Sequence, residues 1–124
     1  MRVKKLLDKK GHDVYTISPD ATVYDALQLM AEKEIGALVV LEDGKMVGIL
    51  SERDYARKII LKGKSSKETP VREIMTTKVI HTSPDKKVGK CLSLMTKHHF
   101  RHLPVLEKER LVGILSIEDV KVVT

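Results

Sequence analysis

The stretch Val47-Gly48-Ile49-Leu50-Ser51 occurs again, unchanged, 65 positions later as Val112-Gly113-Ile114-Leu115-Ser116. At this offset residues 14–55 align with residues 79–120 without a gap, and 18 of the 42 aligned positions are identical. Similarity over this length in one register indicates that the chain contains two copies of one structural unit. The repeat also predicts a pseudo-twofold axis between the copies.

Within each copy the pattern of apolar residues predicts the order strand, helix, hairpin, helix. Asp43-Gly44 between two apolar runs is a strong signal for a two-residue hairpin turn. Pro104 has no N–H and favours an edge or strand-start position. Helices are expected to follow Ser51 and Ser116, so the fold class is α/β with two β-α-β-β-α repeats. The expected strands span residues 14–17, 37–41 and 46–50 in the first copy and residues 79–82, 103–106 and 111–115 in the second.

Three segments lie outside the aligned copies. Apolar residues from Val3 onward predict a short leading helix that ends near Gly11. Residues 62–68 are polar and are expected to form a loop. Thr69-Pro70 is typical of a helix N-terminus, with Thr69 as the cap, and predicts a short helix through Met75. The chain then divides into a first unit with its leading helix at 1–62, a linker at 63–70 and a second unit at 71–124.

The composition is typical of a folded domain, with 124 residues of which 42% are hydrophobic and 32% charged. The single cysteine, Cys91, excludes an intramolecular disulfide and fits a reducing compartment. No apolar run approaches the roughly 20 residues of a membrane span, and the N-terminus lacks the apolar stretch of a signal peptide. A soluble cytoplasmic protein without membrane contact is expected. The net charge of +6 attracts polyanions, which leaves nucleic acid, a nucleotide and an acidic partner open.

Both hairpins end on the pattern Gly-x-x-Ser-x-x-Asp, at Gly48–Asp54 and Gly113–Asp119. Two interpretations of this pattern stay open. Serine followed three residues later by an acid forms a capping box, which only starts a helix. Alternatively, the helix N-terminus holds a phosphate, the aspartate accepts hydrogen bonds from a ribose diol, and the glycine lets the ligand approach the backbone.

Tandem β-α-β-β-α repeats that close each hairpin with this pattern resemble a pair of cystathionine-beta-synthase (CBS) domains, or Bateman module. Ser51–Lys58 and Arg101–Val105 are similar to the small stand-alone prokaryotic members. The resemblance implies a regulatory module, not an enzyme, that senses energy or redox state by binding an adenine nucleotide between the repeats. It implies no obligatory cofactor, a homodimer, and an unidentified regulated protein as partner. The implied ligands are AMP, ADP, ATP, NADH or S-adenosylmethionine.

The same resemblance implies two crossed pockets, each with residues from both copies. One pocket would take Ser116 and Asp119 with Tyr15, Gly36 and Ala37. The other would take Ser51, Arg53 and Asp54 with Ile80, Arg101 and His102, and Thr76 matches a further position that commonly touches the ligand. Arg101 and His102 stand where the family often faces the phosphates, so the Ser51 pocket is expected to be the more cationic. Glu118 is expected to weaken phosphate binding near Ser116.

Other chemistry has weaker support in the sequence. Three histidines, His98, His99 and His102, suggest a metal site together with Cys91. Adjacent histidines point in different directions on a helix, however, and Cys91 lies on an apolar helix face, so no metal is expected. No nucleophile–base pair falls in a defined pocket, so no catalytic residue is assigned. Two rival functions stay open: a nucleic-acid-binding module, which the scarcity of aromatic residues disfavours, and a structural dimerisation module with vestigial pockets.

Overall fold

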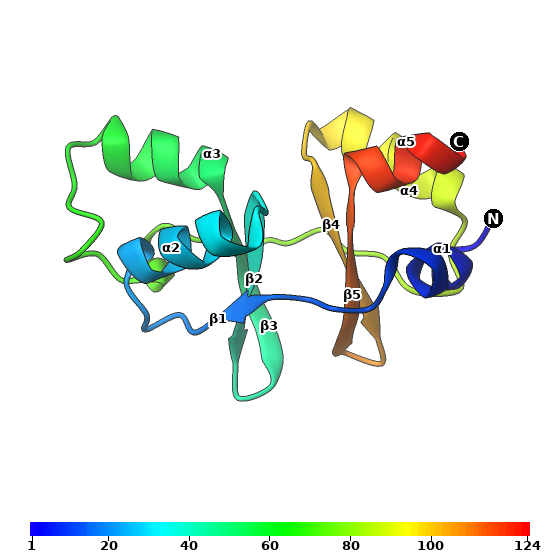
Figure 1. Ribbon diagram of the computed structural model, residues 1–124, viewed down its shortest axis with the longest axis horizontal. Coiled ribbons are helices and arrows are strands. Elements are labelled where there is room, and N and C mark those ends of the chain that lie inside the picture. Colours follow the sequence, from blue (N-terminus) through cyan, green and yellow to red (C-terminus); the bar gives the residue numbers. More distant parts are fainter. The chain divides into compact units, whose positions relative to one another are not determined.

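A computed structural model describes all residues from Met1 to Thr124 (Figure 1). The chain divides into two compact units: the central unit is Tyr15–Val79, and the terminal unit joins Met1–Val14 to Ile80–Thr124. Both combine a β-hairpin with helices, so the α/β class with two repeated units is confirmed. The predicted division at 1–62, 63–70 and 71–124 follows the sequence repeats. In the structure, the segment that leads each repeat belongs instead to the compact unit that contains the other repeat.

The central unit is a three-stranded sheet with helices packed against it. Its elements are β1 (Thr16–Ile17), α2 (Val23–Lys33), β2 (Ala37–Glu42), β3 (Lys45–Ser51), α3 (Glu52–Tyr55), the π-helix η1 (Ala56–Ile60) and the 3-10 helix η2 (Val71–Glu73). β1 pairs in parallel with β2, which pairs antiparallel with β3. Helices α2 and α3 lie on one side of this sheet (Figure 1). Aliphatic side chains from α2 and the sheet form the core, together with Ile59, Val71 and Ile74.

The terminal unit is a two-stranded hairpin with three helices. Its elements are α1 (Val3–Lys10), α4 (Val88–His98), β4 (His102–Glu107), β5 (Arg110–Ser116) and α5 (Ile117–Val123). Helix α1 ends at Gly11, as expected, where φ is 106°. The fully buried Cys91 of α4 belongs to the core, which confirms its assignment as a core residue. Pro104 lies on the edge strand β4, also as expected.

The segments that lead the two repeats make matching contacts in the two units. In the terminal unit the Val3 N–H donates to the Lys86 carbonyl at 2.9 Å. In the central unit the Val71 N–H donates to the Ala21 carbonyl at 2.8 Å, and both valines are fully buried. Helix α1 therefore does in the terminal unit what η2 does in the central unit. The leading segment of the first repeat thus completes the core formed by the second repeat, and the leading segment of the second repeat completes the core formed by the first.

The strand predicted at residues 79–82 is wrong, because only Thr82 bridges β4, at Val105. In the central unit β1 pairs with two consecutive residues of β2, beginning at Val39. The matching residue of β4 is Pro104, whose missing N–H shortens the parallel ladder. Pro104 thus lies on an edge strand, as expected, and also prevents most of the strand expected at residues 79–82 from forming.

The helix predicted from Thr69 through Met75 is also wrong in its details. Pro70, not Thr69, is the N-cap, and the helix is the single 3-10 turn η2. The Thr69 hydroxyl instead donates to the Ser65 carbonyl at 2.7 Å. The turn stops early because the chain then straightens to bridge β3, where Thr76 and Ile49 exchange backbone hydrogen bonds of 2.9 and 3.0 Å.

The two hairpin turns have the same backbone but different sequences. Asp43 and Gly44 have φ values of 54° and 79°, and Lys108 and Glu109 have φ values of 50° and 68°. Two consecutive positive φ values are typical of the type I′ turn, which suits Asp-Gly. The second turn carries two residues with side chains in this left-handed region, so it is the more strained of the two.

We expect Glu109→Gly to stabilise the protein by about 1 kcal/mol, because glycine adopts a positive φ without steric cost. The reverse change in the first hairpin, Gly44→Glu, is the matched control and is expected to destabilise by about the same amount. Urea denaturation followed by circular dichroism measures both. Equal midpoints for Glu109→Gly and the wild type would show that the second turn is not strained.

Candidate functional site

The serine–aspartate pairs at both hairpin ends are capping boxes. Ser51 Oγ accepts from the Asp54 N–H at 3.2 Å, and Asp54 Oδ2 accepts from the Ser51 N–H at 3.0 Å. Ser116 and Asp119 make the same two bonds at 3.1 and 2.8 Å. The capping interpretation is confirmed at both positions. Because each box uses Oδ2 of its aspartate, the other carboxylate oxygen decides what else the motif can bind.

At Asp54 that other oxygen is already engaged within the central unit. Oδ1 accepts from the Thr76 hydroxyl at 3.2 Å and lies 3.1 Å from Lys58 Nζ. Oδ2 accepts from the Ser51 hydroxyl at 3.1 Å, in addition to the backbone bond of the cap. A carboxylate offers about four lone-pair positions, so Asp54 is fully occupied. A ligand hydroxyl has to displace Thr76 or Lys58 to reach it.

At Asp119 only Oδ2 is engaged. This oxygen accepts from the Ser116 N–H and lies 2.9 Å from Lys10 Nζ, while Oδ1 makes no hydrogen bond or ion pair. The Asp119 side chain is 26% exposed and that of Asp54 is 11% exposed. Burial by itself raises the pKa of Asp119, but the Ser116 N–H and the Lys10 ammonium outweigh it, and the pKa lies below its usual value. Asp119 is thus an ionised carboxylate with one available oxygen.

Other residues of the protein lie close to both glycines of the motif. A Cβ atom on Gly113 would lie 2.7 Å from Leu7 Cδ2. A Cβ atom on Gly48 would lie 2.8 Å from Met75 Sδ and 2.9 Å from the Thr76 carbonyl oxygen. The close approach that the sequence analysis assigned to a ligand is made here by the leading segments, which explains the glycines without a ligand.

The residues that open each hairpin lie beside the motif of their own unit. Glu52 N–H donates to the Gly36 carbonyl at 3.1 Å, and Ala37 pairs with Ser51. In the terminal unit, Ile117 N–H donates to the Arg101 carbonyl at 2.8 Å, and His102 pairs with Ser116. The structure therefore brings Gly36 and Ala37 to Ser51, and Arg101 and His102 to Ser116. The crossed pockets join residues of both units and stay a prediction.

The Arg101 guanidinium forms an ion pair with Glu118 of the same unit. The backbone N–H of Glu118 and then the Arg101 charge favour the ionised carboxylate, so the pKa of Glu118 is below its usual value. The two opposite charges lie beside the Ser116 cap. The positive charge of Arg101 is therefore neutralised by Glu118. The sequence analysis did not predict this ion pair.

The remaining predicted site residues are spread over both units. Tyr15 is exposed in the central unit, and Lys33 Nζ lies 5.2 Å from the centre of its ring. Arg53 is exposed on α3. Ile80 is half-buried against the terminal core. Thr76 is joined to Asp54, so the structure connects it directly with the motif.

The two lysines on the aspartates were missed in the sequence analysis. Lys58 follows Asp54 by four residues, a spacing at which side chains meet on a helix, so its pairing could have been found. Lys10 is far from Asp119 in the sequence and reaches it only because α1 packs in the terminal unit. No sequence signal indicates that contact.

No group of three or more histidine, cysteine or acidic side chains is placed to hold a metal ion. Burial raises the pKa of the Cys91 thiol, although a hydrogen bond with Thr82 opposes this shift. None of the helices combines the length and apolar character needed to cross a membrane.

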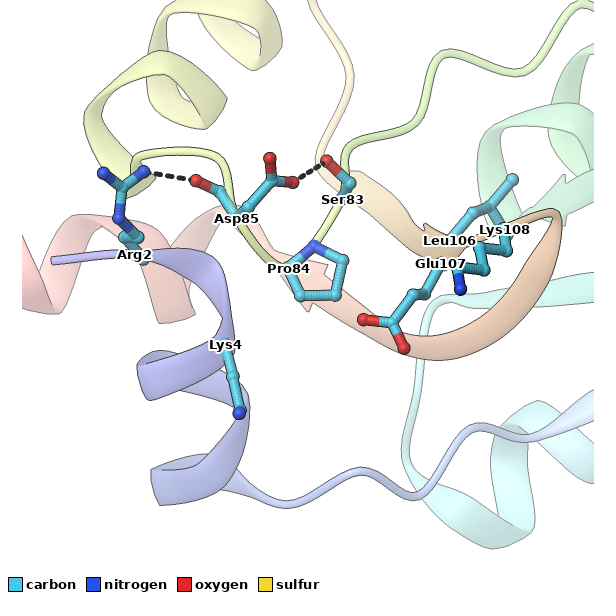
Figure 2. Close-up of a pocket in the computed structure, with 8 residues that line it drawn as sticks. All are labelled: Arg2, Lys4, Ser83, Pro84, Asp85, Leu106, Glu107 and Lys108. Atoms are coloured by element: carbon cyan, nitrogen blue, oxygen red, sulfur yellow. Dashed lines mark hydrogen bonds between the residues drawn. The ribbon is translucent and has the colours of Figure 1, made fainter.

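A cavity of about 410 Å³ lies elsewhere in the terminal unit, between the start of α1, the segment before α4 and the β4–β5 turn (Figure 2). In the central unit, Arg72 joins Asp20 and Glu42 at 3.1 and 2.7 Å. The matching residues around the cavity are Lys4, Asp85 and Glu107, which form no such bridge. Figure 2 shows the Asp85 carboxylate turned toward Ser83 instead. The Ser83 hydroxyl donates to Asp85 Oδ1 at 2.6 Å. The cavity contains none of the predicted site residues. It is lined by Arg2, Lys4, Ser83, Pro84, Asp85, Leu106, Glu107 and Lys108.

Comparison with known proteins matches residues 3–61 and 71–123 to the CBS domain family. CBS domain-containing protein CBSX3, mitochondrial, from Arabidopsis thaliana is 46% identical over 106 residues. The match covers 82% of this chain and 52% of the plant protein, so the chain spans about half of that relative.

Solved structures agree over almost the whole chain. The crystal structure of the CBS domain protein NE2398 has a TM-score of 0.95 at 44% identity, covering 100% of this chain and 98% of that one. The CBS domain pair of protein MJ0100, crystallised with 5′-methylthioadenosine and S-adenosyl-L-methionine, has a TM-score of 0.88 at 26% identity. That match covers 99% of this chain and 94% of the other.

We expect Gly48→Ala to destabilise the protein by about 2–3 kcal/mol and Gly113→Ala by about 1–2 kcal/mol, as overpacking does. The difference arises because the Cβ on Gly48 meets the Thr76 carbonyl, which is fixed by its bridge to Ile49, whereas the Cβ on Gly113 meets only side-chain atoms of Leu7. Urea denaturation measures both variants. Gly89→Ala on α4, where a Cβ meets nothing within 4 Å, is the control and is expected to stabilise slightly. A larger loss for Gly113→Ala than for Gly48→Ala would contradict this explanation.

The ion pair at Asp119 predicts a pH dependence of stability. Because folding lowers the pKa of this carboxyl, its ionised form stabilises the fold above the ordinary value of 3.8, and the contribution is lost as the pH falls through the lower folded value. Replacing Lys10 with methionine removes a group that lowers this pKa, so the pKa of Asp119 should rise in Lys10→Met. Carboxyl NMR titration measures it, with Lys9→Met as the control. An unchanged titration in Lys10→Met would show that the ion pair does not form in solution.

Proposed function

Because the chain belongs to the CBS domain family, with two CBS domains in tandem, we propose that it binds a ligand built on adenosine and acts as a regulatory module. The observation that carries this proposal is the motif carboxylate Asp119, held ionised with one oxygen available to a donor. A ribose diol supplies two such donors. The adenosyl ligands of the MJ0100 pair support the same ligand class.

We further propose that the ligand contacts residues of both repeats, as the family resemblance implies. One set centres on Ser116 and Asp119, the other on Ser51 and Asp54. Asp119 is the more open acceptor, since Asp54 is saturated by its own unit. The ligand candidates are AMP, ADP, ATP, NADH and S-adenosylmethionine.

The proposed role is regulatory rather than catalytic. A ligand shifts the affinity for a partner only if it binds two states of the protein unequally. The partners proposed from the family are a second copy of the chain and a regulated protein, with the cytoplasm as the proposed location. Nucleic-acid binding and a purely structural dimerisation module are the alternatives that the same experiment tests.

Calorimetric titration of the five candidate ligands tests this function directly. We expect Asp119→Asn to lower AMP affinity about 10- to 100-fold, the usual cost of losing a hydrogen bond to a charged group. Asparagine keeps an oxygen for the Ser116 cap, so the helix start is retained. The 2′-deoxy analogue of AMP should bind the wild type weakly. Asp25→Asn, an exposed change on α2, is the control.

Two results would contradict the proposed function. The first is that none of the five ligands binds the wild type, which would favour the structural module. The second is that an oligonucleotide binds instead, with an affinity that falls steeply with salt. Equal AMP affinity of wild type and Asp119→Asn would remove Asp119 from the site.

A further inference from the structure

Lys10 brings a positive charge to the motif of the terminal unit. It is the last residue of α1, and its Nζ donates to the Ile114 carbonyl at 2.7 Å and lies 2.9 Å from Asp119 Oδ2. A lysine ammonium has three N–H donors. The structure uses two of them, and the side chain is 27% exposed. One donor is therefore left on the Lys10 ammonium, which already contacts the Asp119 carboxylate.

The central unit offers no such combination. Lys58 Nζ contacts Asp54 Oδ1 and donates to the Ile74 carbonyl at 2.9 Å, but the carboxylate it contacts is saturated. Lys58 also lies one turn from Asp54 on the same helical segment, whereas Lys10 comes from a separate helix. Only the terminal unit presents an open acceptor and an open cationic donor side by side.

Lys10 supplies one of the two cations that pair with the carboxylates at the Ser116 cap. Asp119 and Glu118 are negative, and Lys10 and Arg101 each pair with one of them. Without Lys10 the Asp119 carboxylate loses its cationic partner, and its negative charge then repels an anionic ligand. His12, near the end of α1, pairs with Asp8 and therefore adds no contact to the motif carboxylate.

We propose that Lys10 is a ligand-binding residue that sets the charge class of the ligand at the Ser116–Asp119 motif. This inference rests on the proposed binding of an adenosyl ligand. Asp119 Oδ1 accepts the ribose hydroxyls, and the third N–H of Lys10 binds a phosphate oxygen of the same ligand. Phosphorylated nucleotides are thereby favoured over uncharged nucleosides at this motif, and helix α1 becomes part of the binding site.

The contact also connects the ligand with the N-terminal helix. Lys10 and His12 hold the end of α1 to the β5 backbone, at Ile114 and Val112. A ligand that binds Lys10 while leaving its bond to Ile114 in place adds a further restraint on this end of α1. Binding should therefore slow the local opening of α1.

The test compares AMP with adenosine by calorimetry in the wild type, Lys10→Gln, Lys10→Arg and Lys9→Gln. We expect Lys10→Gln to weaken AMP about tenfold and adenosine less than about threefold, since a charge-assisted bond to phosphate is lost. Lys10→Arg keeps the charge and should keep the ratio of the two affinities. Lys9→Gln removes the same charge from the exposed face of α1 and should leave the ratio unchanged.

Hydrogen exchange of the wild type with and without AMP gives a second readout that needs no variant. Slower exchange of the α1 amides with AMP supports the proposal. Faster exchange, or tighter AMP binding by Lys10→Gln, would show that the ligand expels Lys10, and overturns it. An unchanged affinity ratio in Lys10→Gln overturns it as well, while leaving the proposed function intact. If neither AMP nor adenosine binds the wild type, the proposed function and this inference fall together.

Discussion

The close packing of a leading segment against a glycine-bearing strand is the constraint on which each unit depends. Leu7 packs on Gly113 of β5, and Met75 and Thr76 pack on Gly48 of β3. The apolar side chains of α1, Val3, Leu6 and Leu7, are buried in the terminal core, and burying each contributes about 1.5–3 kcal/mol. Because each leading segment belongs in sequence to the other repeat, neither repeat has a complete core from its own residues.

The same exchange gives the two motifs different neighbours. The leading segments deliver Thr76 to Asp54 and Lys10 to Asp119. The Thr76 hydroxyl and Lys58 saturate the Asp54 carboxylate, whereas Lys10 leaves one oxygen of the Asp119 carboxylate available. Two copies of one motif therefore differ in chemistry although both form the same capping box. The difference comes from the segments that precede the repeats and from Lys58, whose matching position in the second copy is Val123.

The capping and ligand interpretations of the Ser-x-x-Asp motif are compatible. The cap uses Oδ2 of each aspartate and fixes the orientation of the carboxylate. A carboxylate fixed in this way loses no side-chain entropy when a ligand binds, which favours binding. The same aspartate side chain thus starts the helix and serves as an acceptor. The cap bonds Oδ2 and thereby holds Oδ1 in the position where a ligand would use it.

The sequence by itself determined the repeat, most of the element order, both hairpins and both capping boxes, because these depend on residues close together in the chain. Asp43-Gly44 and the Ser-x-x-Asp spacing specify local backbone geometry, and the apolar periodicity specifies which face is buried. Only the tertiary structure decided which unit α1 completes and which cation meets Asp119. Those contacts join residues more than 100 positions apart, and packing against Gly113, rather than any local pattern, brings Lys10 to the carboxylate. The strand expected at residues 79–82 is absent for a similar reason. The missing N–H of Pro104 acts on a segment that becomes its neighbour only in the tertiary structure.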